Sequence, residues 1–316
     1  MNKREHKDVL IGCLCALGCE TLFGLSYIFT KQAANDASTL SLLGWRFLVA
    51  IIVMGLCAFG GIIKIHLKGK KLKPLITVAL FSPCIYFIGE TIGIRSTTAS
   101  ESGAFLACIP VISLLASTFI LHKKPRKKQV IGILVTLAGV LVTVFAVGAA
   151  ASFSFVGYAM LTVAVISYAL YSVFVEKAPE YTGGEITFVM LAAGAIVFGV
   201  LAVLEASLNG NLNDVIRLPF TSMSFLIAIL YQGVGCSVLA FFLSNVAISR
   251  IGVNRTSSFI GAATVVSIVA GILILKEGFS GLQMIGAFLI IAGVYIANTH
   301  FPGKAAERVT QAFPGK

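Results

Sequence analysis

Apolar segments of about twenty residues, separated by short polar stretches, recur along the whole chain. At ~1.5 Å per residue, an apolar helix of this length crosses the ~30 Å hydrocarbon core of a bilayer. The pattern predicts an all-α polytopic membrane protein without a soluble domain. Its ten membrane-spanning helices are expected at residues 9–31, 40–63, 75–94, 98–121, 129–147, 155–175, 185–205, 222–247, 254–275 and 281–299.

Composition supports a membrane setting, because 58% of the 316 residues are hydrophobic and only 12% are charged. With the N-terminus inside, nineteen of the twenty-four Lys and Arg residues fall on the inner side and four on the outer side. This asymmetry predicts that both termini, residues 1–8 and 300–316, are cytoplasmic. The membrane is expected to be the plasma membrane. The net charge of +11 therefore reflects topology. Because the cations are scattered through short loops, the sequence predicts the lipid bilayer as partner and no nucleic acid.

Two pairs of segments indicate that the chain is an internal duplication. "GCLCALGCETLFGLSYIFTKQA" from Gly12 aligns with "GYAMLTVAVISYALYSVFVEKA" from Gly157 at an offset of 145 residues. A longer segment from Phe105 aligns without gaps with the segment from Phe259 at an offset of 154, and both contain the triplet Ala-Gly-Val. Five spans in each half would insert the second copy upside down, as in many transporters. The expected repeats are residues 9–148 and 154–299.

Three stretches carry a family resemblance: "LGWRFLVA", the proline-centred "LACIPVISLLAS" and "LKEGFSGLQMIGAFLIIAGVYI". They resemble the drug/metabolite transporter superfamily, specifically its EamA-type members of ten helices in two repeats. The resemblance implies a polytopic carrier in which helices 1–4 and 6–9 surround a central cavity, while helices 5 and 10 lie towards the periphery. It does not name the substrate.

Glu20 is the ionisable residue that interrupts the first span. It lies about eleven residues from the start of that span, or ~16 Å, which is half of the hydrocarbon thickness. A carboxylate at this depth costs on the order of 2.5–3.5 kcal/mol and should face the bundle or a wet cavity. Two interpretations stay open: a group that binds a proton or a cationic part of the substrate, or a hydrogen-bonded carboxyl group that fastens helices together.

Pro110 is expected at a similar depth in the fourth span, where it would free the carbonyl group of Leu106 and kink the helix. The exposed backbone could serve the substrate, or the kink could serve packing alone. Arg46 and Glu90 lie at matching depths near the outer ends of the second and third spans. They are predicted to form an ion pair that acts as a brace or as an outer gate.

Further polar side chains within the spans are candidates for the substrate or proton pathway: Tyr27, Tyr86, Tyr168, Tyr171, Gln232 and Asn245. The seven cysteines all fall inside predicted spans, where cysteine packs as a small apolar residue, so neither disulfides nor a metal site is predicted. No nucleotide-binding loop and no enzyme signature is present, and no cofactor is expected.

The leading interpretation is a secondary transporter that exports an amino acid or a related small molecule, with a coupling proton. An exchanger or importer of a phosphorylated or nucleotide-linked metabolite is the alternative, but it would need several cations in the cavity, and Arg46 alone is evident within a span. A non-transport membrane scaffold is disfavoured by the inverted duplication.

Overall fold

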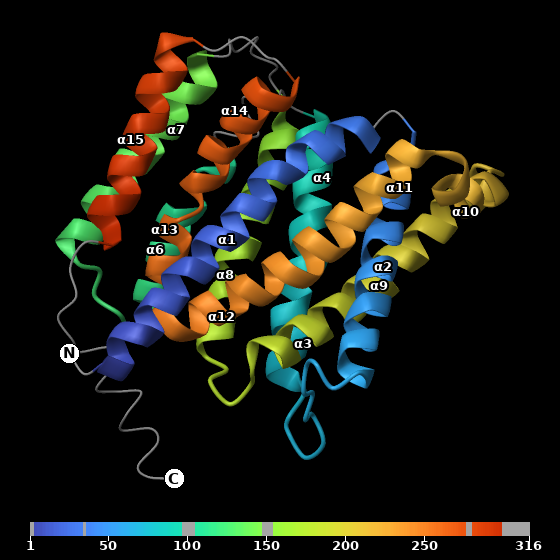
Figure 1. Ribbon diagram of the computed structural model, residues 1–316, viewed down its shortest axis with the longest axis horizontal. Coiled ribbons are helices and arrows are strands. Elements are labelled where there is room, and N and C mark those ends of the chain that lie inside the picture. The colour runs from blue at the N-terminus through green and yellow to red at the C-terminus, as the bar shows by residue number, and fades with distance from the viewer. Residues whose placement is uncertain (1–2, 34–35, 97–104, 147–153, 276–279, 299–316) are drawn as a thin grey trace.

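The computed structural model describes residues 3–33, 36–96, 105–146, 154–275 and 280–298, which form helices joined by loops and, within these ranges, no strands (Figure 1). The helices are α1 (Lys3–Ala33), α2 (Thr39–Phe59), α3 (Lys73–Ala79), η1 (Leu80–Ile85), α4 (Tyr86–Ser96), α6 (Ile109–Ile120), α7 (Lys127–Ala146), α8 (Phe155–Glu176), α9 (Gly183–Leu208), α10 (Leu212–Thr221), α11 (Met223–Leu230), η2 (Tyr231–Ala240), α12 (Phe241–Ile251), α13 (Val253–Ser258), α14 (Gly261–Leu275) and α15 (Gly281–Asn298).

Seven helical stretches in the described ranges are long and apolar enough to cross a membrane: His6–Ser26, Thr39–Phe59, Lys73–Gly93, Phe155–Glu176, Gly183–Leu208, Met223–Ile251 and Gly281–Asn298. They coincide with seven of the predicted spans. The other three predicted spans fall on α6, on α7 and on α13 with α14. Large apolar side chains point outward, as on α15, where Phe288 is 71% exposed and Tyr295 69%. Such an apolar exterior suits an integral membrane protein, whose surroundings are lipid.

The helix that contains Pro110 is interrupted, and not merely kinked. Residues 107–108 form a turn, and Pro110 then occupies the first turn of α6, where its missing N–H group is tolerated. The second half breaks without a proline and two residues before the equivalent place, since α13 ends at Ser258 and α14 begins at Gly261. Thr264, the counterpart of Pro110, lies inside α14.

The third and eighth predicted spans, residues 75–94 and 222–247, both contain π-helical segments, η1 and η2. In η1 the backbone of Ser82 leaves the helical region, with φ −142° and ψ 122°, and Pro83 follows it. At the 154-residue offset, residues 80–85 of η1 align with residues 234–239 of η2. Such segments loosen the hydrogen-bond ladder and occur frequently at functional sites.

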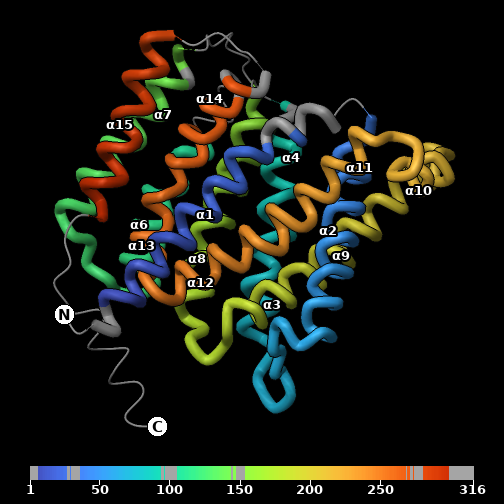
Figure 2. Tube along the Cα trace, viewed as in Figure 1, coloured from blue at the N-terminus to red at the C-terminus, as the bar shows by residue number. Residues whose placement is uncertain are grey.

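The two halves of the chain interlock. The most extensive helix contacts all join the first half to the second: α7 with α15, α2 with α9, α8 with both α4 and α6, and α1 with both α12 and α14. Figure 2 shows α15 beside α7 at one side of the molecule and α1 crossing α12. The core is therefore built between the halves.

The α7–α15 contact is a close approach of backbones at four glycines. A Cβ atom on Gly132 would lie 2.6 Å from the carbonyl oxygen of Gly293, and one on Gly139 would lie 2.8 Å from that of Gly286. At the 154-residue offset, Gly132 corresponds to Gly286 and Gly139 to Gly293. The early residues of α7 meet the late residues of α15, so the two helices run antiparallel. Small residues at such a crossing allow tight packing in lipid.

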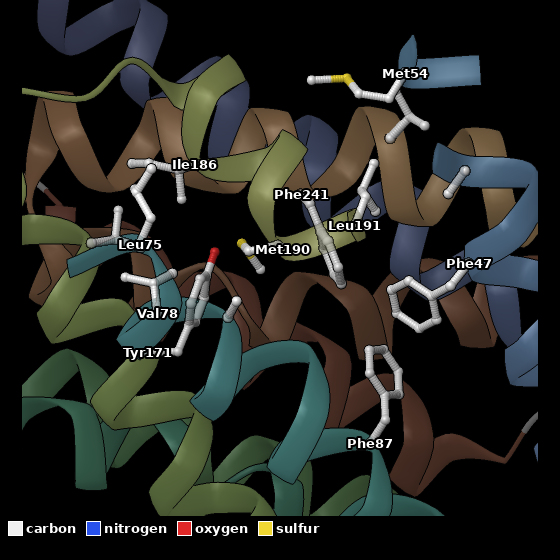
Figure 3. Close-up of a cluster of buried hydrophobic side chains, with 14 of the residues drawn as sticks. Phe47, Met54, Leu75, Val78, Phe87, Tyr171, Ile186, Met190, Leu191 and Phe241 are labelled. Carbon is white, nitrogen blue, oxygen red and sulfur yellow. The ribbon is translucent and has the colours of Figure 1, made fainter. Parts of the chain in front are cut away.

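A cluster of aromatic rings fills the centre of the bundle between α2, α4, α9 and α12 (Figure 3). Phe47 stacks against Phe198 with ring centroids 5.3 Å apart and meets the edge of Phe87 at 5.6 Å. Phe241 lies 6.4 Å from both Phe47 and Phe87. We call these four rings the aromatic layer.

Candidate substrate pathway

Glu20 lies inside the bundle on α1 and is only 5% exposed. Within the ranges that the structure describes, its carboxyl group has no hydrogen-bond or ion-pair partner. Its charge acts on two tyrosines of α8, Tyr168 and Tyr171, and on its neighbour Cys19. A carboxyl group in this position can take up a proton or bind a cation, because no fixed partner already neutralises it.

Tyr171 and Asn245 form a buried network beside Glu20. The Tyr171 hydroxyl group donates to Oδ1 of Asn245 at 2.7 Å, and Nδ2 of Asn245 donates to Oγ1 of Thr187 at 3.0 Å. The network joins α8, α12 and α9. Because Asn245 is fully buried and bonded on both sides, it holds the three helices in register beside the site and is less free to bind a substrate.

Ser244 connects this network to the neighbourhood of Glu20. Its hydroxyl group lies 3.4 Å from that of Tyr171 and close to the side chains of Tyr168 and Cys19. Tyr168 in turn packs edge-on against Tyr86 of α4, with ring centroids 5.6 Å apart. Two tyrosines of α8 therefore lie near the carboxyl group of Glu20. We call Glu20, Tyr168, Tyr171 and Ser244 the Glu20 cluster.

The aromatic layer lies on one side of the Glu20 cluster. Phe23, about one turn beyond Glu20 on α1, lies 6.2 Å from Phe241, measured between ring centroids. Phe241 itself comes one turn before Ser244 and Asn245 on α12. The Glu20 cluster therefore borders on phenylalanine rings.

Arg46 lies against the aromatic layer and is 7% exposed. Its Nε donates to Oγ of Ser237 in η2 at 2.8 Å, and its guanidinium group stands 4.7 Å above the centre of the Phe87 ring. A cation–π contact in a desolvated site is worth up to ~2 kcal/mol. Arg46 therefore ties α2 to both η2 and α4.

The predicted Arg46–Glu90 ion pair is wrong as a direct contact. Oε1 of Glu90 accepts a hydrogen bond from the hydroxyl group of Tyr86 at 2.7 Å, one turn earlier on α4. Among the described residues, no ion pair joins Glu90 to Arg46, although their charges still interact through space. Arg46 and Glu90 lie at similar depths along their helices but do not pair, because the Arg46 side chain points to Ser237 and Phe87. Whether either residue acts as a gate stays a prediction.

Of the remaining sequence candidates, Gln232 and Pro110 belong to helices η2 and α6. Gln232 is buried in η2, one residue after Tyr231, whose hydroxyl group donates to the carbonyl oxygen of Leu22. Pro110 is buried at the start of α6. Tyr27 belongs to α1, but its side chain lies outside the described part of the structure.

Glu185 is a buried carboxylate that the sequence reasoning missed. It is 1% exposed, and its oxygens accept from Nζ of Lys70 at 2.8 and 2.9 Å and from the backbone N–H groups of Thr182 and His66. The loop between α2 and α3 is thereby fastened to the start of α9. The sequence Thr182-x-x-Glu185 is a capping box and could have revealed the helix start, but not the lysine.

Family comparison agrees with a membrane carrier. Residues 10–145 and 155–299 match the model of the EamA-like transporter family. The chain belongs to this family. The resemblance seen in the sequence is thereby confirmed, together with the assignment of the chain as a membrane transporter.

Relatives of this EamA-like transporter span nearly its whole length. The uncharacterized transporter YcxC of Bacillus subtilis (strain 168) is 28% identical over 285 residues, which are 90% of this chain and 91% of the relative. A protein of Salmonella typhimurium (strain LT2) named "Probable amino-acid metabolite efflux pump" is 22% identical and covers 97% of this chain and 99% of its own. A crystal structure with a TM-score of 0.73 and 19% identity covers 93% of this chain and 98% of its own, which supports the fold alone.

Proposed function

We propose that this EamA-like transporter exports a small metabolite, an amino acid or a related compound, across the plasma membrane by secondary transport. The observation that carries the proposal is Glu20, a carboxyl group buried within the bundle and without a bonding partner in the described ranges. Relatives from Salmonella typhimurium and Escherichia coli, both 22% identical, are named amino-acid metabolite efflux pumps, which supports the same substrate class.

The proposed architecture is ten spans in two inverted repeats, with both termini in the cytoplasm. Three equivalences support it: the glycines of α7 and α15, the breaks before α6 and α14, and the π-helical segments η1 and η2. The antiparallel contact of α7 with α15 is the arrangement that an upside-down second copy would give. Inverted repeats allow alternating access, because one half can rock against the other around a fixed site.

Glu20 would couple transport by exchanging its ligand. When it faces one side of the membrane it takes up a proton or the amine of a substrate, and when it faces the other side it releases that ligand. The aromatic layer, with Phe23 packed against its Phe241, would keep the site from opening to both sides at once, since apolar rings exclude water and ions. Tyr168 would supply a hydroxyl group and a ring face to the substrate.

Flux measurements in proteoliposomes test this function directly. The purified protein is reconstituted, and uptake or release of a metabolite panel is followed with and without a pH gradient. The panel includes amino acids and phosphorylated metabolites, so that the importer alternative is tested in the same experiment. Transport of amino acids that depends on the pH gradient is expected.

The variants Glu20→Gln and Glu20→Asp, compared at matched amounts of reconstituted protein, then test the residue. Glu20→Gln keeps the size of the side chain but removes its charge, so flux should fall at least tenfold and lose its pH dependence. Glu20→Asp should retain partial flux. Glu180→Gln removes an exposed carboxylate elsewhere and is the matched control. A Glu20→Gln protein with the wild-type rate and pH profile would make Glu20 a helix-fastening residue and contradict the proposed coupling.

A further inference from the structure

The short helix α10, between α9 and α11, exposes two faces of opposite character. Ile216 and Phe220 are 51% and 86% exposed and lie one turn apart, and we call them the apolar face of α10. Asp214, Arg217 and Thr221 are also exposed and, at spacings of three and four residues, share a polar face. An apolar and a polar face side by side on one helix are typical of helices that lie in a bilayer interface.

The third face of α10 packs on the bundle. Val215, Leu218 and Pro219 follow each other at the spacing of one helix face, and Pro219 is buried. Leu218 packs against a buried cluster that contains Leu42 of α2 and Phe225 of α11. Because these contacts fix the rotation of α10 about its own axis, the apolar face stays directed away from the bundle.

Trp45 of α2 indicates the depth of α10 in the membrane. Its Nε1 donates to the carbonyl oxygen of Val215 at 2.9 Å. The 21 residues of α2 extend ~32 Å, about the thickness of the hydrocarbon core. Trp45 follows the first residue, Thr39, by six residues or ~9 Å. α10 therefore lies beside the first turns of α2, at the boundary of the hydrocarbon core, and not in the water beyond it.

The orientation of α10 also suits an interface. In Figure 1, α2, α9 and α11 extend across the view, whereas α10 stands at their common end and is seen nearly along its axis. The axis of α10 therefore crosses those of the membrane-spanning helices, as expected for a helix that lies in the plane of the membrane.

The apolar face of α10 continues the apolar exterior of the neighbouring spans. Leu208 is the last residue of α9 and Met223 the first of α11, and both are exposed. Large apolar side chains are thus exposed before, along and after α10. Contiguous apolar surface of this kind is unfavourable in water, and the lipid that surrounds α9 and α11 is the partner that suits it.

We propose that α10 is an interfacial helix whose apolar face inserts into the phospholipid bilayer at the level of the headgroups. Ile216 and Phe220 would enter the adjoining acyl chains, and Arg217 on the polar face would lie among the phosphate groups. Since α10 contacts α9 and α11 and is bonded to Trp45, it would hold the ends of three spans at this level. The inference is separate from Glu20 and does not depend on the proposed transport.

The fluorescence of a tryptophan placed on α10 tests the proposal in the full-length protein. Trp45 is the only native tryptophan, so the wild type measured in parallel supplies the background to subtract. Phe220→Trp and Ile216→Trp place the reporter on the apolar face. The matched control Thr221→Trp places it on the polar face at the same end of the helix.

Each protein is reconstituted into nanodiscs of phosphatidylcholine, either plain or with bromine atoms on the acyl chains. Brominated chains quench only a tryptophan that touches them. Potassium iodide quenches a tryptophan that is open to water, and nanodiscs leave both membrane surfaces accessible to it. Because all three substitutions are at exposed positions, the variants should fold, which size-exclusion chromatography checks.

Brominated lipid should quench Phe220→Trp and Ile216→Trp several-fold more strongly than Thr221→Trp, and iodide should show the opposite order. If iodide quenches the apolar-face reporters as strongly as the control, α10 lies in water. If neither quencher reaches those reporters, protein covers the apolar face, as in an assembly of two copies of the chain. Either of these results would overturn the proposal.

Discussion

Replacement of Gly293 by alanine is expected to destabilise the α7–α15 pair. The added Cβ atom would lie 2.5 Å from the backbone nitrogen of Thr136 and 2.7 Å from the carbonyl oxygen of Gly132, whereas ordinary contacts begin at 3.4 Å. The overlap is therefore 0.7 to 0.9 Å, the difference between these values. Because both contacted atoms belong to backbone, no change of side-chain rotamer relieves the overlap, and α15 must move away from α7.

The expected magnitude follows from two opposing effects. Alanine favours a helix over glycine by about 1 kcal/mol. Overpacking at a tight contact costs about 1–3 kcal/mol, and the upper end applies here because the contact is with backbone at two points. The net loss is therefore about 2 kcal/mol. At Gly199 of α9 no atom lies within 4 Å of the position that a Cβ atom would take, so Gly199→Ala should lose nothing and can gain from helix propensity.

Thermal unfolding of the detergent-solubilised protein, followed by size-exclusion chromatography, measures the difference. Gly293→Ala should lower the midpoint by several degrees, and Gly199→Ala should leave it unchanged or raise it. Gly286→Ala should resemble Gly293→Ala, since its Cβ atom would lie 2.8 Å from the carbonyl oxygen of Gly139. Equal midpoints for Gly293→Ala and Gly199→Ala would refute the reasoning that backbone contact holds α7 against α15.

Three further predictions concern the ion network and the topology. Glu185→Gln should weaken the contact with Lys70, so that trypsin cleaves the loop of residues 60–72 several-fold faster. An unchanged cleavage rate would show that Glu185 does not hold this loop against α9. Arg46→Leu and Glu90→Leu should each lower thermal stability, and the two losses should add in the double variant, because the two side chains have different bonding partners. Recovery of stability in the double variant would instead indicate a direct Arg46–Glu90 pair. Reporter fusions at Gly69 and Lys127 should read cytoplasmic and those near Asp36 and Asn211 external; a cytoplasmic signal at Asn211 would exclude inverted repeats.

Hydrophobic patterning predicted the helices well but not all of their ends. The second span was expected to reach residue 63, because Ile62 and Ile63 continue the apolar run, whereas α2 ends at Phe59. Gly61 adopts φ 72°, a left-handed conformation that glycine accepts readily and that stops the helix. Residues 212–221 were expected as loop and form α10, because ten residues of mixed polarity carry too weak a signal. The π-helical segments likewise have no reliable sequence signal.

Candidate site residues could be named from the sequence, but their contacts could not. The depth of Glu20 in its helix follows from counting residues, and the structure places it inside the bundle. Its neighbours Tyr168 and Ser244 come from the other half of the chain, and a single sequence does not say which faces of two helices meet. The Arg46 prediction failed for the same reason, since depth along a helix does not determine the direction of the side chain. Tyr86 and Glu90 are one turn apart on one helix, and local spacing alone brings them together.

The pairing of every major helix with a partner from the other half sets the order of events during biosynthesis. At about 5–20 residues per second, the second half is completed roughly 10–30 s after the first has entered the membrane. During this interval the glycine face of α7, the tyrosine face of α4 and the polar face of α1 have lipid or insertion machinery beside them. The helices of the first half are therefore inserted in the membrane before their packing partners exist. A chain truncated between the halves would leave these faces exposed to the cell's quality-control machinery.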